Sequence, residues 1–163
     1  MSVAIVMGSD SDESVMRLAA DALDEFEVAW EMRVLSAHRT PDLAIEFARQ
    51  AHSRDVQVII AGAGGAAHLP GVLAAVTPLP VIGVPIALKA LDGMDSLLSI
   101  VQMPRGIPVA TVGIDNARNG GLLAVRILGA TDPKMRLAIT EFQARLAAEV
   151  QGRDEALQSR LGH

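Results

Sequence analysis

Short apolar runs alternate with helical patterns along the chain, and this alternation constrains the fold more than any other feature of the sequence. The runs Ser2–Met7, Val56–Ala61 and Pro80–Pro85 contain no charged residue. Such runs are typical of strands that are buried on both faces of a parallel sheet. The segments Val28–Leu35 and Pro108–Gly113 also have strand character. The sequence therefore predicts five strands.

Helical patterns separate these strands. Apolar residues recur at helical spacing, and polar residues that can cap a helix precede several of the segments. The predicted helices are Asp12–Glu25, Pro41–Ser53, Val72–Val76, Met94–Val101, Asn116–Leu128 and Asp132–Arg160. Five strands that alternate with helices favour an α/β fold, with a parallel sheet in the order 2-1-3-4-5, right-handed crossovers and helices on both faces.

The length of 163 residues is enough for one domain with a buried core, and too short for two domains of ordinary size. We expect residues 1–131 to form the α/β core and residues 132–163 to form a long C-terminal helix. The apolar stripe of that helix includes Met135, Phe142 and Val150. On an isolated domain this stripe would be exposed to water, so we expect the helix to contact neighbouring subunits.

Composition excludes several classes of function. The formal net charge is -5 and no basic run occurs, so the chain lacks the electrostatic signature of a nucleic-acid-binding protein. No cysteine is present, which excludes disulfides, thiolate metal sites and cysteine nucleophiles and agrees with a reducing compartment. No segment approaches ~20 uninterrupted apolar residues, and no secretory signal pattern opens the chain. We expect a cytoplasmic protein with no membrane partner.

Polar loops follow the first three predicted strands, at Ser9–Asp12, Ser36–Pro41 and Gly62–Leu69. In the order 2-1-3-4-5 these strands are neighbours, so we expect the three loops to line a single pocket. The second loop carries His38 and Arg39. An imidazole that titrates near neutral pH, beside a permanent positive charge and at a helix start that attracts anions, suits proton transfer on a phosphorylated substrate.

The third loop is rich in small residues, which let a ligand or another backbone approach closely. It fits the loose pattern G-x-G-x-x-G/A of dinucleotide sites, but no acidic residue follows until Asp92. We therefore interpret these small residues as a contact surface for a planar ligand or a phosphate. For His68 in this loop, a structural and a catalytic role fit the sequence equally well. A two-histidine metal site ranks below an organic anion, because no further ligand lies near His68.

Several polar residues of these loops are also good helix caps. Ser9 and Asp12 can cap the first helix, and they can also contact a ligand. In a phosphosugar site, Arg39 and hydroxyl or N–H donors would bind the phosphate, whereas the Asp12 anion would be repelled by phosphate and suits ribose hydroxyls. Thr40 is predicted to cap the second helix, with Pro41 in its first turn.

Five motifs occur in an order that resembles one known family. They are Gly8-Ser-Asp-Ser-Asp12, Ser36-Ala-His-Arg-Thr-Pro41, Ala61-Gly-Ala-Gly-Gly-Ala-Ala-His-Leu-Pro-Gly71, Gly83-Val-Pro85 and Asp95-Ser-Leu-Leu-Ser-Ile-Val-Gln-Met-Pro104. From about Val3 to Leu128 the chain resembles the PurE family, the N5-carboxyaminoimidazole ribonucleotide mutases of purine biosynthesis. The resemblance implies a flavodoxin-like three-layer sandwich and a homo-octamer. It also implies transfer of a carboxyl group from the exocyclic nitrogen to ring carbon C4 of aminoimidazole ribonucleotide, without metal or organic cofactor.

The resemblance further implies roles for individual residues. His38 is similar to the family's general acid and base, and the small residues up to Ala67 would enclose the released CO2. The residues implied to bind the substrate are Gly8, Ser9, Asp12, Ser36, Arg39, Ala63, Gly64, Ala67, His68 and Leu69. Two departures from the family pattern, Glu13 in place of a frequent Trp and the segment Val112–Asn119, bear on local packing or subunit contacts.

Two alternatives stay open. The first is direct carboxylation of aminoimidazole ribonucleotide by free CO2, which ranks second because Asp95–Pro104 resembles the mutase branch. The second is a non-catalytic flavodoxin-like module that binds a flavin or a nucleotide. Its weakness is the scarcity of aromatic residues for ring stacking, which are Phe26, Trp30, Phe47 and Phe142.

Overall fold

Five parallel strands form one sheet within residues 1–162, the part of the chain that this structure, a computed structural model, describes. The strand order β2-β1-β3-β4-β5 confirms the predicted order 2-1-3-4-5. The strands are β1 (Ser2–Met7), β2 (Ala29–Val34), β3 (Val56–Gly64), β4 (Val81–Ile86) and β5 (Ala110–Thr111). His163, the last residue of the predicted C-terminal segment, lies outside the described residues.

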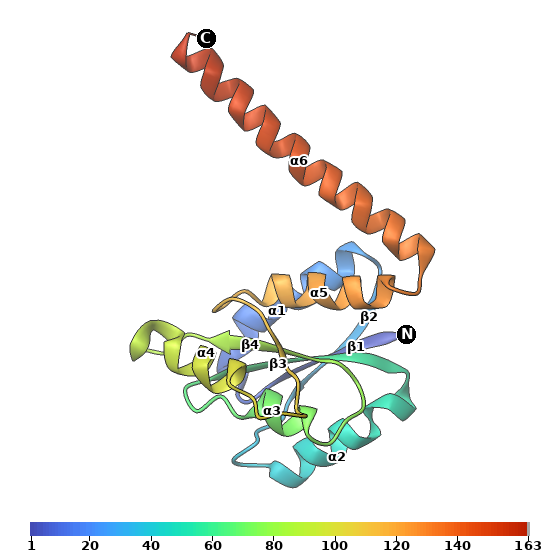
Figure 1. Ribbon diagram of the computed structural model, residues 1–163. Helices are drawn as coiled ribbons and strands as arrows, with labels where there is room; N and C mark the ends of the chain where they lie inside the picture. Colours follow the sequence, from blue (N-terminus) through green and yellow to red (C-terminus); the bar gives the residue numbers. More distant parts are fainter. Residues whose placement is uncertain (163) are drawn as a thin grey trace.

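Helices cover both faces of the sheet, as Figure 1 shows. The helices are α1 (Glu13–Glu25), α2 (Pro41–Ala51), α3 (Leu69–Ala74), α4 (Met94–Val101), α5 (Ala117–Gly129) and α6 (Pro133–Leu161), with 3-10 turns η1 (Asp10–Asp12), η2 (His52–Arg54) and η3 (Leu91–Gly93). α1 and α5 lie side by side on one face, and α2, α3 and α4 cover the other. This arrangement is the flavodoxin-like three-layer sandwich that the resemblance implied.

The two faces of the sheet carry two separate hydrophobic cores. Successive residues of a strand point to opposite faces. In β1, Val3 and Ile5 belong to the core under α1 and α5, whereas Ala4 and Val6 belong to the core under α2 and α3, and all four are fully buried. The apolar run at the start of the sequence is continuous because helices cover both of its faces.

The structure differs from the sequence predictions most clearly at three elements, β3, α3 and β5. β3 continues three residues beyond its predicted end, to Gly64, because its last residues still pair with β4. α3 begins three residues earlier than predicted, at Leu69, since Pro70 fits the first turn of a helix. β5 contains only Ala110–Thr111 where six residues were predicted. Pro108 has no N–H to donate to a ladder, so pairing at this edge of the sheet begins late.

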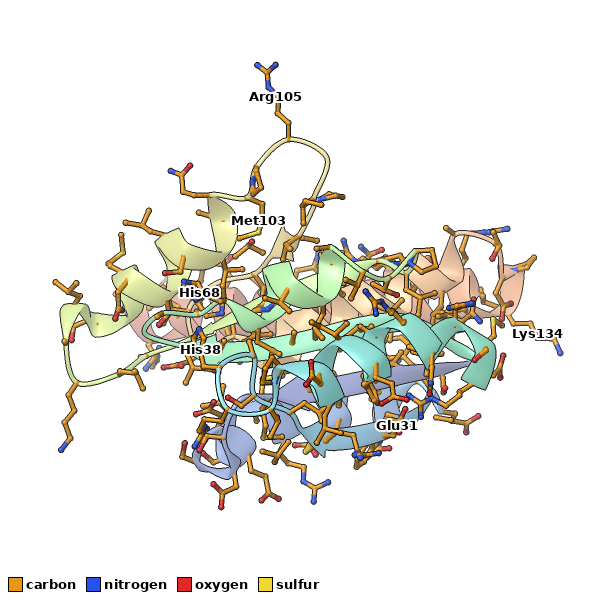
Figure 2. The ribbon with its side chains drawn as sticks, turned by 90° about the horizontal axis from the view of Figure 1, so that it is seen from below. Glu31, His38, His68, Met103, Arg105 and Lys134 are labelled. Atoms are coloured by element: carbon orange, nitrogen blue, oxygen red, sulfur yellow. The ribbon has the colours of Figure 1, made fainter. Side chains whose placement is uncertain are left out.

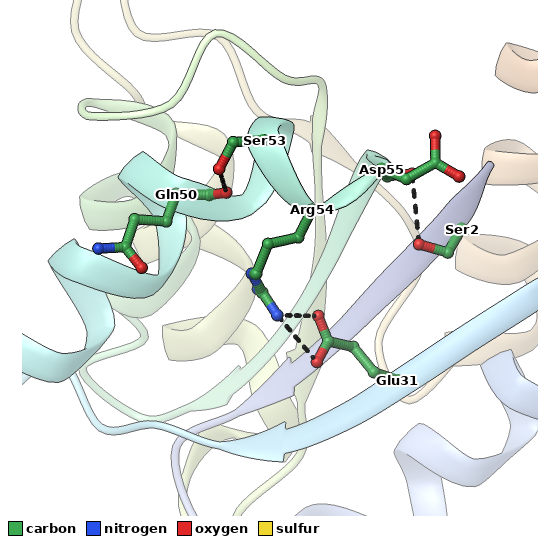
Figure 3. A network of polar contacts seen from close by, with 6 residues as sticks. All are labelled: Ser2, Glu31, Gln50, Ser53, Arg54 and Asp55. Atoms are coloured by element: carbon green, nitrogen blue, oxygen red, sulfur yellow. Dashed lines mark hydrogen bonds and ion pairs between the residues drawn. The ribbon is translucent and has the colours of Figure 1, made fainter.

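Polar contacts tie the strands together at the end of the sheet opposite to the polar loops (Figure 3). The Ser2 hydroxyl donates to the backbone oxygen of Asp55 at 3.3 Å, and the Ser2 N–H donates to the same oxygen at 3.0 Å. The Arg54 guanidinium contacts both carboxylate oxygens of Glu31, at 3.0 and 3.3 Å. These partly exposed contacts align the starts of β1, β2 and β3 and leave the other end of the sheet free for a ligand.

The predicted long C-terminal helix is present as α6, which projects from the sandwich (Figure 1). Its start is capped by Asp132, whose carboxylate accepts from the Lys134 N–H at 2.8 Å. Phe142 packs edge-to-face on Phe26 with ring centroids 5.5 Å apart. Beyond Phe142, every described residue of α6 is exposed. None of the helices in residues 1–162 is long and apolar enough to cross a membrane.

At Gly121 the helix α5 packs closely on α1, and this contact generates a prediction about stability. A Cβ at Gly121 would lie 2.6 Å from the Ala19 carbonyl oxygen and 2.8 Å from the Ala22 Cβ. We expect Gly121→Ala to lower the free energy of unfolding by about 1–3 kcal/mol, the usual cost of overpacking a core. Urea denaturation measures the change.

The neighbouring Gly120 provides the matched control for this substitution. Its added Cβ would lie 3.3 Å from the Val84 Cγ2, a methyl group that can shift by a few tenths of an ångström. Gly120→Ala should therefore stay within about 1 kcal/mol of the wild type, helped by the higher helix propensity of alanine. Equal stability of the two variants would contradict close packing of α1 on α5.

Candidate functional site

A cavity of about 390 Å³ opens at the carboxyl ends of β1, β2 and β3. All three polar loops singled out in the sequence contribute to its wall, together with one residue from the loop after β4. The lining residues are Gly8, Ser9, Ser11, Asp12, Ser36, Ala37, His38, Arg39, Ala63, Gly64, Ala66, His68, Leu69 and Leu88. The predicted convergence of the three loops on a single pocket is therefore confirmed.

The register of the strands brings these loops to the same level. Met7, the last residue of β1, pairs with Val34 on β2 and with Gly62 on β3. Segments that leave neighbouring parallel strands at the same level turn over the same edge of the sheet. The backbone pairing of the strands therefore brings the three loops together, independently of the contacts between their side chains.

Two histidines meet across the cavity. The His38 Nε2 lies 2.7 Å from the His68 Nδ1, and the two rings are nearly perpendicular, at 85°. Figure 2 shows the pair close together and far from the outward-pointing Arg105 and Lys134. In this hydrogen bond one ring nitrogen must be the N–H donor and the other must be the acceptor, so the tautomer of one ring fixes that of the other. The pair therefore presents His38 in a defined orientation, although His38 itself is exposed to solvent.

Arg39 connects the loop after β2 to the loop after β1. Its Nη2 donates to the Gly8 carbonyl oxygen at 2.5 Å, and its Nε donates to the Ser36 hydroxyl at 3.3 Å. A guanidinium has five N–H groups, so these two bonds leave donors for an anion in the cavity. The positive charge is thereby fixed at one wall of the pocket.

Thr40 corrects one sequence prediction. It occupies the N-cap position of α2, but its side chain makes no capping hydrogen bond. Instead its hydroxyl accepts from the Ser36 N–H at 3.0 Å and donates to the Ser36 carbonyl oxygen at 3.2 Å. The hydroxyl therefore closes the loop that carries His38 and Arg39. Pro41 lies in the first turn of the helix, as predicted.

Of the two residues that the sequence offered as helix caps, Ser9 and Asp12, only Ser9 makes a capping hydrogen bond. The Ser9 hydroxyl caps η1 by accepting from the Ser11 N–H at 3.3 Å. Asp12 stands at the N-cap position of α1 without capping it, and only 8% of the residue is exposed. Burial raises the pKa of Asp12 above its ordinary value of 3.8, against the opposing effects of the Ser11 hydrogen bond and the Arg39 charge. Its carboxylate remains available to a polar ligand.

The loop after β3 departs from expectation at one residue. Ala63, Gly64, His68 and Leu69 line the cavity as expected, but Ala67 does not. Ala67 is fully buried in the core under α2 and α3, because the turn between β3 and α3 directs its methyl group inward. The exposed neighbour Ala66 lines the cavity instead. Ala67 therefore lines no part of this cavity, and enlarging it would disturb the core.

Sequence reasoning missed four lining residues. Ser11, Ala37 and Ala66 lie within the predicted loops, and only the direction of their side chains was unknown. Leu88 follows β4 and belongs to a loop that the argument from three strands left out. Because the predicted strand order places β4 beside β3, the loop after β4 could have been expected to reach the cavity as well. Leu88 is half exposed but lies close to Gly64, where an added Cβ would be 3.0 Å from the Leu88 Cγ.

Comparison with known proteins relates the chain to one family. Residues 2–149 match the sequence model of a family described as AIR carboxylase. The chain is 62% identical over 156 residues to the N5-carboxyaminoimidazole ribonucleotide mutase of Mycobacterium leprae, which covers 96% of this chain and 91% of that protein. The crystal structure of Treponema denticola PurE matches with a TM-score of 0.88 and 26% identity, over 96% of this chain and 98% of that one.

A further relative has a different name and a different length. The phosphoribosylaminoimidazole carboxylase of Schizosaccharomyces pombe is 61% identical over 140 residues, which are 86% of this chain and 25% of that protein. Identity alone therefore does not separate the two activities. This chain spans 91% of the Mycobacterium leprae mutase and 25% of the Schizosaccharomyces pombe carboxylase.

The raised pKa of Asp12 generates a prediction about stability and pH. The folded protein binds the Asp12 proton more tightly than the unfolded chain does, so ionisation costs stability as the pH rises from 3.8 through the raised pKa. We expect Asp12→Asn to raise the free energy of unfolding at pH 7. The gain should vanish well below pH 3.8, because the protonated Asp12 is then neutral in both the folded and the unfolded protein, like the asparagine that replaces it.

Denaturant titrations at a series of pH values measure this difference. The exposed Asp21 of α1 supplies the control variant Asp21→Asn, because its side chain stays exposed in the folded protein and its charge is not among those that shift the pKa of Asp12. A gain for Asp12→Asn that is the same at every pH would show that burial of the charge is not its cause.

Proposed function

Because this chain belongs to the AIR carboxylase family, we propose that it is an N5-carboxyaminoimidazole ribonucleotide mutase. The enzyme would move the carboxyl group of its substrate from the exocyclic nitrogen to ring carbon C4, a step of purine biosynthesis. The relatives of Mycobacterium leprae, Mycobacterium tuberculosis and Pyrococcus horikoshii, which are 62%, 61% and 56% identical to this chain, are named as mutases, and this supports the same activity here.

The observation that carries the proposal is the His38–His68 pair in a pocket that also contains Arg39 and Asp12. The C–N bond of the carbamate breaks, its electron pair returns to the nitrogen, and His38 gives that nitrogen a proton. The C4 carbon then attacks the released CO2, and His38 removes the proton from C4. One proton is given and one is taken back, so a single imidazole completes the cycle.

The charges of the pocket favour one orientation of the ribonucleotide. Arg39, helped by the hydroxyls of Ser9 and Ser36, would bind the phosphate through charge-assisted hydrogen bonds. Asp12 would accept hydrogen bonds from the ribose hydroxyls, since its negative charge disfavours a position beside the phosphate. Gly8, Ala63 and the loop from Gly64 to Leu69, with the exception of the buried Ala67, would contact the sugar and the heterocycle.

The proposed reaction needs no cofactor, because substrate and product differ only in the position of one carboxyl group. Its site would contain the phosphorylated imidazole ribonucleotide alone, without a metal ion. We place the enzyme in the cytoplasm, in agreement with the absence of cysteine from the sequence. An assay with the carbamate substrate and no added bicarbonate tests the mutase directly. Activity that depends on added CO2 would favour the carboxylase instead.

We also propose that residues 1–131 act as the catalytic core and that residues 132–163 assemble the chain into a homo-octamer. The supporting feature is the second half of α6, where Leu146, Val150 and Leu157 remain 45%, 64% and 43% exposed. Apolar side chains along one helix are costly to leave in water, and a second copy of this chain would cover them.

His38→Asn tests the proposed catalytic group. Asparagine keeps a polar side chain but cannot exchange a proton near neutral pH, so kcat should fall by about 10²- to 10⁴-fold. Binding of the product should persist, as isothermal titration calorimetry would show. His52→Asn is the control, because His52 is exposed in η2 and lines no part of the cavity. Full activity of His38→Asn would refute the proton-transfer role.

Light scattering on the full chain tests the proposed assembly. We expect a mass eight times that of the 17.1 kDa chain. Val150→Asp should lower this mass, because it places a charge in the apolar stripe, whereas Gln151→Asp at the next position should not. A single-chain mass for the wild-type protein would contradict the assembly.

A further inference from the structure

Ser96 is a fully buried hydroxyl outside the cavity. Within residues 1–162, Asp12 and Ser96 are the polar or charged residues that are buried, and Ser96 is 0% exposed. Its Oγ donates to the Ile86 carbonyl oxygen at 2.7 Å and accepts from the Gly65 N–H at 2.8 Å. Ser96 is absent from the cavity wall. Its hydroxyl therefore joins two backbone segments and lies outside the cavity lining.

The two bonds lie where β3 and β4 separate. Gly64 and Ile86 form the last pair of the β3–β4 ladder. Gly65 is the next residue along the chain, and its N–H has no ladder partner beyond that point. The hydroxyl of Ser96, in the first turn of α4, inserts between the two strand ends and replaces the missing partner of each. A buried N–H and a buried carbonyl oxygen both require such a partner.

Both segments continue directly into the cavity wall. The chain beyond Gly65 supplies Ala66 and His68, and the chain beyond Ile86 supplies Leu88. Leu88 also packs on the start of the first segment, since a Cβ added at Gly65 would lie 3.2 Å from the Leu88 Cδ1. Ser96 thus holds together the two loops that form one side of the pocket.

The chain between Gly65 and His68 is tightly turned. The Ala67 N–H donates to the Gly65 carbonyl oxygen at 2.8 Å, and the His68 N–H donates to the Ala66 carbonyl oxygen at 2.8 Å. Gly65 itself has a φ of +64°, in the left-handed region that glycine adopts without strain. Because these two hydrogen bonds constrain the loop, a displacement of Gly65 should also displace His68.

We propose that Ser96 is a positioning residue of the active site, which acts through the Gly65–His68 loop to hold the His68 ring against His38. This inference rests on the proposed function, because it assigns the hydroxyl a part in the same proton transfer. The path is short: the Ser96 hydroxyl fixes the Gly65 N–H, the turn fixes His68, and the His68 Nδ1 contacts the His38 Nε2 at 2.7 Å.

Ser96→Ala tests the proposal. Alanine fits the same space but leaves the Gly65 N–H and the Ile86 carbonyl oxygen without a partner, so the loop should move. A small misplacement of a catalytic group lowers turnover strongly, and we expect kcat to fall by about 10- to 100-fold. KM should change by much less, because Arg39 and Asp12 belong to other loops. In ¹⁵N NMR spectra, the signals of the His38 and His68 rings should change.

Ser99→Ala is the matched control on the same helix. The Ser99 hydroxyl donates to the Asp95 carbonyl oxygen of its own helix at 2.7 Å, and its contact with Gly65 is a long 3.4 Å approach to the carbonyl oxygen. This variant should keep kcat and the histidine signals. A folded Ser96→Ala protein with wild-type kcat and unchanged histidine signals would overturn the proposal, and so would an equal loss in Ser99→Ala.

Hydrogen exchange on the wild-type protein keeps the proposal testable if Ser96→Ala does not fold. The Gly65 amide should exchange slowly although it lies in a loop, because its partner is buried. Fast exchange at Gly65 would overturn the proposal. Neither this measurement nor the NMR spectra need mutase activity, so they separate a failure of this inference from a failure of the proposed function.

Discussion

The parallel pairing of β1 with β2 and β3 is the constraint on which the rest of the structure depends. Met7 pairs with Val34 and with Gly62, so three strands deliver their chains to the same edge of the sheet. The helix that follows each of these strands returns the chain to the opposite end of the sheet, as in right-handed crossovers. Only loops therefore lie at the end where the strands finish. The site is a consequence of that register, and the polar contacts of the loops refine it.

Within the site, polar contacts connect loops that are far apart in the sequence. Arg39 bonds to Gly8, and His38 contacts His68, so the loop after β2 is joined to the loops on both sides of it. These contacts hold the charged groups in place before a ligand binds. The free-energy cost of ordering them on binding is therefore smaller. Ser96 extends this network to the loop after β4 from behind the cavity wall.

The sequence predicted those features that depend on periodicity and on the order of elements. The strand order, both layers of helices and the convergence of three loops follow from apolar runs and from general rules of α/β folds. The orientation of Ala67, the capping role expected of Thr40 and the length of β5 depend on individual turns and on edge pairing. Spacing along the sequence carries no information on where a turn directs a methyl group, or on which donor a buried hydroxyl will meet.

The central claim is that the His38 imidazole exchanges a proton with the heterocycle while the other loops hold the sugar and phosphate. A crystal structure of the wild-type protein with bound 4-carboxy-5-aminoimidazole ribonucleotide tests it most directly. The account predicts the His38 ring within about 3 Å of the reacting end of the heterocycle, with the phosphate beside Arg39. A ribonucleotide bound with its heterocycle turned away from His38 would contradict it.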